Sequence, residues 1–228
     1  MKKLTYISLI ILQIVHVTLP AQSADSIFYF KSHAQGTHFL YVPAALIVSG
    51  VVLNDHGEEA FRREIVEARN ASIPKFKTHV DDYLQLAPIG IAYGLDIFGV
   101  KSKNDFINKS IILLKGEALM TVTVFGLKKL THQLRPDNSA YNSFPSGHTA
   151  QAFAGATFLT EEYKDKIKWM PYFAYGIASS VGILRMANNK HYISDVLAGA
   201  GFGILSMKLS YITHQYKWGR KRITNNEN

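Results

Sequence analysis

Two histidines and an aspartate in the second half of this 228-residue chain have the types and spacing of an acid–base site. His191 and Asp195 are four residues apart, so in a helical turn they share a face and can form a hydrogen bond. An imidazole that a carboxylate orients can act as a nucleophile or as a base. His148 ends the segment Pro145-Ser146-Gly147-His148, which is typical of a turn that leads into a helix with Ser146 as its cap.

Three cationic side chains accompany these groups: Lys128, Arg135 and Arg185. Lys and Arg bind the oxygens of a phosphate, and the backbone N–H groups at a helix N-terminus bind a remaining oxygen. Each feature alone also has an explanation without chemistry. Lys128 suits the negative end of a helix dipole, and a His–Asp pair four residues apart is often a plain surface pair. The combination predicts a phosphate site if the fold brings these residues together.

The elements that must position them are six apolar stretches. Their lengths and their Ala, Gly, Leu and Ile content favour helices, and no alternating strand pattern competes. The stretches cover residues 39–53, 83–100, 110–126, 150–159, 171–184 and 196–212. Residues 55–82 are charged and amphipathic, which is consistent with a surface helix broken near Pro74. We therefore expect an all-α fold, a helical bundle of about six core helices.

An up-and-down order of these helices would bring the chemical groups to one end of the bundle. The end of the third helix, the start of the fourth, the end of the fifth and the start of the sixth then lie on the same side. Three cations, two histidines, a hydroxyl and a helix N-terminus would converge there. We expect the active site at that end.

At these residues the chain resembles the type 2 phosphatidic acid phosphatase superfamily, which also contains bacterial acid phosphatases and vanadium haloperoxidases. The family pattern is Lys, six residues and Arg-Pro, then Pro-Ser-Gly-His, then Ser-Arg, five residues, His, three residues and Asp. Every spacing holds here, from Lys128 to Asp195. One departure is Leu184, where the family usually has Ser, so one hydroxyl contact is lost.

The resemblance implies a role for each residue of the pattern. His191 would attack phosphorus and carry the phosphohistidine, Asp195 would orient it, and His148 would protonate the leaving group and then activate water. The phosphoryl oxygens would be held by Lys128, Arg135, Ser146, the Gly147 amide and Arg185. No metal and no cofactor are expected, because three side-chain cations stand where other phosphatases use ions.

The ends of the chain differ in character from its middle. Residues 1–24 combine Lys2 and Lys3, an apolar run and small residues for cleavage, which is the anatomy of a signal peptide. The alternative is a first membrane helix, since the run is nearly long enough to cross. We expect a phosphatase helical domain over residues 25–215 and a basic polar tail over 216–228. The chain has no cysteine, so disulfides and Cys-ligated metals are excluded.

Composition leaves the membrane question open. The net charge of +8 favours anionic partners, and the small residues near the C-terminal end suit close helix packing in lipid. The mean hydropathy of +0.01 is low for a membrane protein, and Lys115 and Glu117 interrupt the third stretch. We expect a bundle in a bacterial inner membrane. More lysines and arginines lie in the connections opposite the site, which favours a periplasm-facing site. This orientation agrees with a signal-bearing N-terminus only if the short stretch 39–53, with its Pro43, does not cross.

The predicted function is hydrolysis of a phosphate monoester or pyrophosphate on a lipid, with lipid A, undecaprenyl pyrophosphate and phosphatidic acid as candidates. The main alternative is a soluble periplasmic acid phosphatase of broad specificity. A third hypothesis is a non-catalytic anion-binding or lipid-binding helical protein with an idle site. Nucleic acid is not an expected partner, because the cations are spread over helix ends of an exported chain.

Overall fold

The computed structural model describes residues 38–54 and 59–214, which form eight helices and no strand. The helices are α3 (His38–Asn54), α4 (Glu59–Ser72), α5 (Val80–Leu84), α6 (Ala87–Ile97), α7 (Phe106–Thr131), α8 (Gly147–Tyr163), α9 (Met170–Ala187) and α10 (Ile193–Ile212). The predicted all-α class is confirmed. The second apolar stretch divides into α5 and α6, and α4 ends at Ser72, just before Pro74. The predicted leader 1–24 and tail 216–228 lie outside the described residues.

Local sequence explains where the helices around the site begin and end. Asp105 caps α7, since its side chain accepts a hydrogen bond from the Asn108 amide at 3.0 Å. That helix ends at His132, which adopts the left-handed conformation with φ 45°. Ser146 caps α8 in the same way as Asp105 caps α7, through the Thr149 amide.

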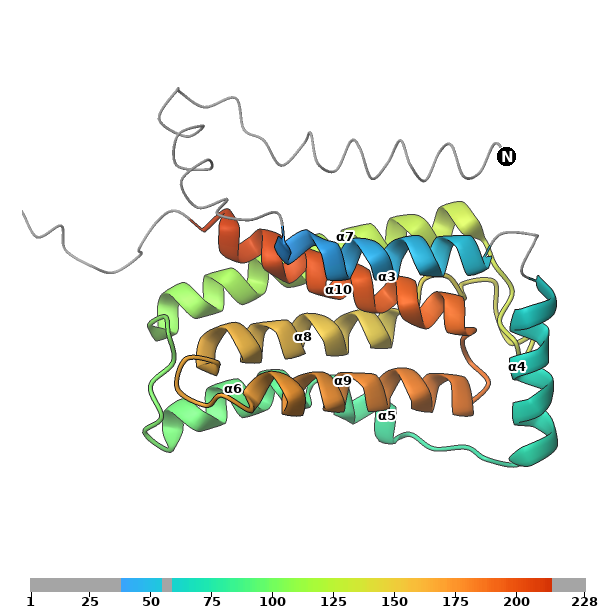
Figure 1. Ribbon diagram of the computed structural model, residues 1–228, viewed down its shortest axis with the longest axis horizontal. Coiled ribbons are helices and arrows are strands. Elements are labelled where there is room, and N and C mark those ends of the chain that lie inside the picture. The colour runs from blue at the N-terminus through green and yellow to red at the C-terminus, as the bar shows by residue number, and fades with distance from the viewer. Residues whose placement is uncertain (1–37, 55–58, 215–228) are drawn as a thin grey trace, which may run out of the picture.

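Helices α3, α7, α8, α9 and α10 run along the long axis of the molecule, and α4 lies across one end of them (Figure 1). α8 and α10 form the centre: α10 packs against α3, α7 and α8, and α8 packs also against α6 and α9. Along α8, most side chains from Thr149 to Tyr163 are buried. The up-and-down order therefore puts the ends of α7 and α9 beside the starts of α8 and α10.

Small residues on α10 allow this close packing on two sides. A Cβ on Gly199 would lie 2.5 Å from the Ser146 carbonyl oxygen of the α8 N-terminus, and one on Gly203 would overlap the Ala150 carbonyl. On the other side, a Cβ on Gly201 would lie 2.7 Å from the Pro43 carbonyl of α3. Real Cβ atoms do not approach so closely, so these positions require glycine.

The place of α3 bears on the condition that residues 39–53 do not cross with the other helices. α3 lies along α10 rather than on an end face, and its Gly50 approaches the Ala198 amide so closely that a Cβ would be 2.6 Å away (Figure 1). Pro43 is accommodated inside the helix. If the bundle crosses a membrane, α3 therefore crosses with it.

The α8–α10 contact predicts a stability difference between two glycines. Gly203→Ala should lower the free energy of unfolding by about 1–3 kcal/mol, because the added methyl group overlaps the α8 backbone. Gly126→Ala in α7 is the matched control, since a Cβ there meets nothing within 4 Å. In the control, the free energy of unfolding should stay the same or rise by up to about 1 kcal/mol, because Ala stabilises a helix more than Gly does. Thermal unfolding of the purified variants measures both, and equal destabilisation would contradict this packing.

Candidate active site

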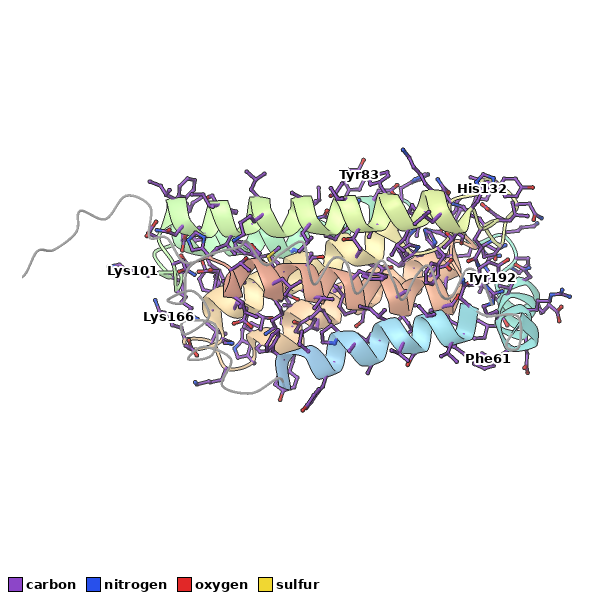
Figure 2. The ribbon with its side chains drawn as sticks, turned by 90° about the horizontal axis from the view of Figure 1, so that it is seen from above. Phe61, Tyr83, Lys101, His132, Lys166 and Tyr192 are labelled. Atoms are coloured by element: carbon purple, nitrogen blue, oxygen red, sulfur yellow. The ribbon has the colours of Figure 1, made fainter. Side chains whose placement is uncertain are left out.

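The eight residues singled out in the sequence lie at the same end of the bundle. The last turns of α7 and α9 carry Lys128 and Arg185, and the first turns of α8 and α10 carry His148 and Asp195. Figure 1 shows these four helix ends next to α4. In Figure 2, the neighbouring residues His132 and Tyr192 lie at this end, and Lys101 and Lys166 lie at the opposite end.

His191 and Asp195 form the pair that their spacing predicts. Nδ1 of His191 lies 3.3 Å from Oδ2 of Asp195, and both side chains are buried. The same oxygen accepts hydrogen bonds from the Tyr192 amide at 2.9 Å and from the Ser143 hydroxyl. Because a carboxylate only accepts, the His191 proton sits on Nδ1 and the lone pair on Nε2. Nε2 is thus the nitrogen that could act as a nucleophile.

Burial controls the charge of His191. Only 3% of the residue is exposed, and desolvation lowers its pKa to about 4, although Asp195 opposes the shift. Lys128 and Arg185 lower the pKa further by charge repulsion. The imidazole is therefore neutral at physiological pH, which is the state that a nucleophile needs.

α4 lies beside His191. A small pocket there is lined by Ile65 and Val66 of α4 together with His191 and Tyr192. Arg69 fastens α4 to the end of α9, because its Nε and Nη2 donate to the Ala187 carbonyl at 2.8 and 2.6 Å. A cation at a helix C-terminus satisfies carbonyls that the helix leaves unpaired.

Arg62 fastens the other end of α4. Its Nη1 donates to Asn54 Oδ1 at the end of α3, at 2.8 Å. Its guanidinium lies 4.9 Å from the centre of the Tyr192 ring, a cation–π contact beside His191. α4 is thus fixed at both ends across the buried face of the site.

Two of the three predicted phosphate-binding cations, Lys128 and Arg185, have polar partners close by. Lys128 donates to the carbonyls of Asn142 and Ser143, the latter at 3.3 Å. Arg185 forms a buried ion pair with Asp81 at 2.6 Å. Burial lowers the pKa of Arg135, and repulsion from Arg185 adds to this effect. Nε of Arg135 is buried and has no hydrogen-bond partner among the described residues, as is also the case for Nε of Arg185.

The start of α8 supplies backbone donors rather than a free hydroxyl. Ser146 is fully buried, its hydroxyl accepts from the Thr149 amide at 3.4 Å, and the Thr149 hydroxyl bonds it at 2.9 Å. The hydroxyl therefore serves as the helix cap in this structure. A Cβ on Gly147 would lie 3.8 Å from Cε of Lys128, so the first amide of α8 is next to a cation. This pairing of amide and cation suits an anion.

His148 has a carboxylate partner that the sequence motif does not contain. Its Nε2 lies 2.9 Å from Oδ1 of Asp82 in the short helix α5, and Oδ2 of Asp82 lies 3.1 Å from Nδ1 of His79. The pKa of Asp82 lies below its ordinary value, first because of the His79 hydrogen bond. Contacts with His148 and Arg185 lower it further against the opposing effect of burial.

Sequence reasoning missed three residues of the site: Ser143, Asp81 and Asp82. Ser143 belongs to an irregular loop, where no periodicity indicates direction. The two aspartates carried a weak signal, because they immediately precede the second apolar stretch, which starts at the site end in an up-and-down bundle. In the described part of the chain, no group of three or more His, Asp or Glu side chains is placed to hold a metal ion.

A comparison of the sequence with known protein families finds a match over the part of the chain that carries these residues. Residues 110–219 match the PAP2 superfamily, over all three motifs from Lys128 to Asp195. The chain carries a PAP2 superfamily domain. The resemblance seen in the sequence is confirmed. The match covers most of α7 and all of α8, α9 and α10, whereas α3 to α6 precede it.

Individual relatives of the PAP2 domain are lipid phosphatases by name. A lipid A 1-phosphatase from Porphyromonas gingivalis is 40% identical over 148 residues, 64% of this chain and 33% of that protein. Phosphatidylglycerophosphatase B from Bacillus subtilis is 28% identical over 182 residues, 73% of this chain and 86% of that protein. The crystal structure of Aquifex aeolicus LpxE aligns with a TM-score of 0.48 at 24% identity, over 64% of this chain and 93% of that chain. This chain spans about a third of the length of the first curated relatives it matches.

The buried dyad predicts an unusually acidic histidine titration. In nuclear magnetic resonance spectra, the His191 ring should become charged only as the pH falls to about 4, because burial disfavours the imidazolium. An unfolded histidine titrates near 6.5, so the folded chain binds fewer protons between these values. Its stability should therefore fall as the pH drops through this window. Asp195→Asn should move the midpoint lower still, and an unchanged midpoint would contradict the pairing.

Proposed function

We propose that this chain is a metal-independent phosphatase that hydrolyses a phosphate monoester or pyrophosphate on a lipid through a phosphohistidine on His191. The observation that carries the proposal is the buried His191–Asp195 pair with its lone pair on Nε2, placed beside three cations in a PAP2 domain. The site pairs a neutral nucleophile with charges suited to a phosphoryl group.

The reaction would proceed in two steps. First, Nε2 of His191 attacks phosphorus, the N–P bond forms, and the bond from phosphorus to the leaving oxygen breaks while His148 gives that oxygen its proton. Asp195 stabilises the imidazolium that results. In the second step a water attacks phosphorus, His148 takes its proton, and the N–P bond breaks to release phosphate.

The phosphoryl oxygens would be held by the cations and by the start of α8. The charges of Lys128, Arg135 and Arg185 act on one another and on Asp195, so all three lie within electrostatic range of a single point. Binding a phosphate dianion would relieve the repulsion among them. The Gly147 amide would bind an oxygen from the helix N-terminus.

The surface of the bundle supports a lipid substrate and a membrane location. α7 and α10 are long and apolar enough to cross a bilayer, and only 28% of the α7 window is buried inside the protein. Large apolar side chains point outward on α3, α7 and α9: Tyr41, Val42, Val48, Val52, Leu114, Val122, Phe125, Leu130, Tyr172, Phe173 and Ile183. A soluble protein rarely exposes so much apolar surface, whereas lipid tails would cover it.

Lipid A is the first candidate among the substrates, because the relative with 40% identity is named for its 1-phosphate. Undecaprenyl pyrophosphate and phosphatidic acid are the others. A soluble periplasmic acid phosphatase is the second candidate function, and the exposed Lys115 in α7 favours it, since a charge facing lipid is costly. Release of the protein into the soluble fraction without detergent would decide for this alternative.

We propose that the site faces the periplasm, with the basic connections at the other end in the cytoplasm. Lys101, Lys103, Lys164 and Lys166 lie in the two connections at that end, two of them labelled in Figure 2. Since α3 runs with the bundle, this orientation starts α3 at His38 on the cytoplasmic side. A signal peptide cleaved after Ala24 would deliver His38 to the opposite side, so the two expectations exclude each other in a spanning bundle.

The proposed function predicts that His191→Asn abolishes phosphate release. Activity on lipid A, undecaprenyl pyrophosphate and phosphatidic acid should fall by roughly 10³-fold or more, because the nucleophile is lost. His214→Asn, at the opposite end where His214 bonds Asn108 at 2.9 Å, is the matched control and should stay active. Activity should survive a chelator, and a brief reaction with labelled substrate should leave acid-labile phosphate on the protein.

The results separate the hypotheses. Full activity in the His191 variant would rule out the phosphohistidine, and no activity in the unmodified protein on any substrate would favour an idle binding site. Loss of activity on adding the chelator would contradict metal independence.

The orientation predicts where a reporter is active. Because α10 starts at the site and runs to the far end, an alkaline phosphatase fused after Asn228 should remain inactive in the cytoplasm. A fusion truncated after Asn138, in the loop at the site, should be active. The reverse pattern would place the site in the cytoplasm and agree with a cleaved signal peptide.

A further inference from the structure

Asp82 connects the proposed acid to the rest of the site. Its Oδ1 lies 2.9 Å from His148 Nε2 and 3.7 Å from Arg185 Nη1, and its Oδ2 lies 3.1 Å from His79 Nδ1. No motif of the sequence includes it. The adjacent Asp81 is fully buried and pairs with Arg185, whereas the Asp82 side chain is 42% exposed.

We propose that Asp82 is the positioning residue of the general acid: it holds His148 by Nε2, so that Nδ1 delivers the proton to the leaving oxygen. This inference rests on the proposed phosphatase reaction. A carboxylate accepts but does not donate, so the proton of the contact belongs to His148 Nε2. Nδ1 has no hydrogen bond to any other described residue, and it is the nitrogen left to face a substrate.

The two histidines then form two oriented pairs with opposite tautomers. Asp195 holds His191 by Nδ1 and exposes Nε2, while Asp82 holds His148 by Nε2 and exposes Nδ1. Their surroundings differ as their tasks require. The His191 pair is almost fully buried, which keeps the nucleophile neutral, while 31% of the His148 side chain is exposed. The Asp82 carboxylate favours the protonated form of this partly exposed imidazole, the form that an acid needs, against the opposing effect of burial.

The pKa of His148 lies below its ordinary value, first because of burial and then because of repulsion from Arg185 of α9. Asp82 and Asp81 of α5 oppose this shift and favour the imidazolium. Asp81 forms an ion pair with Arg185. His79 contacts Oδ2 of Asp82, the oxygen that does not contact His148. Asp82 is therefore the group whose removal acts most directly on His148.

An opposite role for Asp82 makes a different prediction. Because its carboxylate lies between His148 and Arg185, it could occupy the position of a phosphate oxygen and compete with substrate. Removing a competitor raises kcat/KM, whereas removing a positioning carboxylate lowers it. The orienting role is favoured because Oδ1 is closer to His148 than to Arg185, by 2.9 against 3.7 Å.

The test compares Asp82→Asn with Asp81→Asn on two substrates in the full chain. Phosphatidic acid has an alkoxide leaving group that needs an acid, and p-nitrophenyl phosphate has one that leaves without a proton. Asp82→Asn should lower kcat/KM for phosphatidic acid by about 10-fold or more, as part of the roughly 10²–10⁴-fold that general acid catalysis contributes. The same substitution should change kcat/KM for p-nitrophenyl phosphate by less than about threefold. Asp81→Asn should lower kcat/KM for both, because it releases the phosphate-binding Arg185.

A pH profile and a rescue variant complete the experiment. In Asp82→Asn the alkaline limb of kcat/KM for phosphatidic acid should move to lower pH, since His148 loses a neighbouring negative charge, and Asp82→Glu should restore part of the loss. An equal loss on both substrates, an unshifted limb, or a rise in kcat/KM would overturn this role for Asp82. An unmodified chain that releases no phosphate from either substrate would overturn the proposed function as well.

Discussion

The site is organised around Asp195, which joins three segments of the chain. Its carboxylate accepts from His191, from the Tyr192 amide and from Ser143, and its backbone carbonyl accepts from the Ser146 amide at 2.9 Å. One residue thus orients His191, caps the start of α10 and fixes the loop that leads into α8. A buried carboxylate is costly unless its oxygens are satisfied, and here the donors that satisfy it are parts of the site.

Two cations of the site are also held by hydrogen-bond partners within the protein. Lys128 is held by two loop carbonyls, and Arg185 is held by the buried Asp81. These partners fix the charges before a substrate arrives, so little reorganisation is required when a phosphoryl group binds. Nε of Arg135 and Nε of Arg185 are buried and have no hydrogen-bond partner among the described residues. The site therefore contains cations that protein groups hold in place, together with N–H donors that make no hydrogen bond to the described residues.

The helix class and the location of the site were predictable because they depend on order and spacing. Six apolar stretches in an up-and-down bundle require Lys128, Arg185 and Asp195 to meet at one end. The partners were less accessible to sequence reasoning. Ser143 acts from a loop and Asp82 from a helix of five residues, and neither element is long enough to show a hydrophobic period. The place of α3 along α10 was not accessible either, because a short apolar stretch with a proline does not reveal what packs along it.

The glycines of α10 let the helices pack closely enough to bring the residues of the site together. Gly199 and Gly203 let α10 contact the backbone of α8, and Gly201 lets it contact α3, so the centre of the bundle is filled largely by main chain and small side chains. Large apolar side chains are then left to face outward, which suits lipid. The same close approach brings the first turns of α8 and α10 within hydrogen-bond distance of each other. A bundle spaced by larger residues would separate the Ser146 amide from Asp195, and with it His191 from the start of α8, the two parts that the proposed reaction needs together.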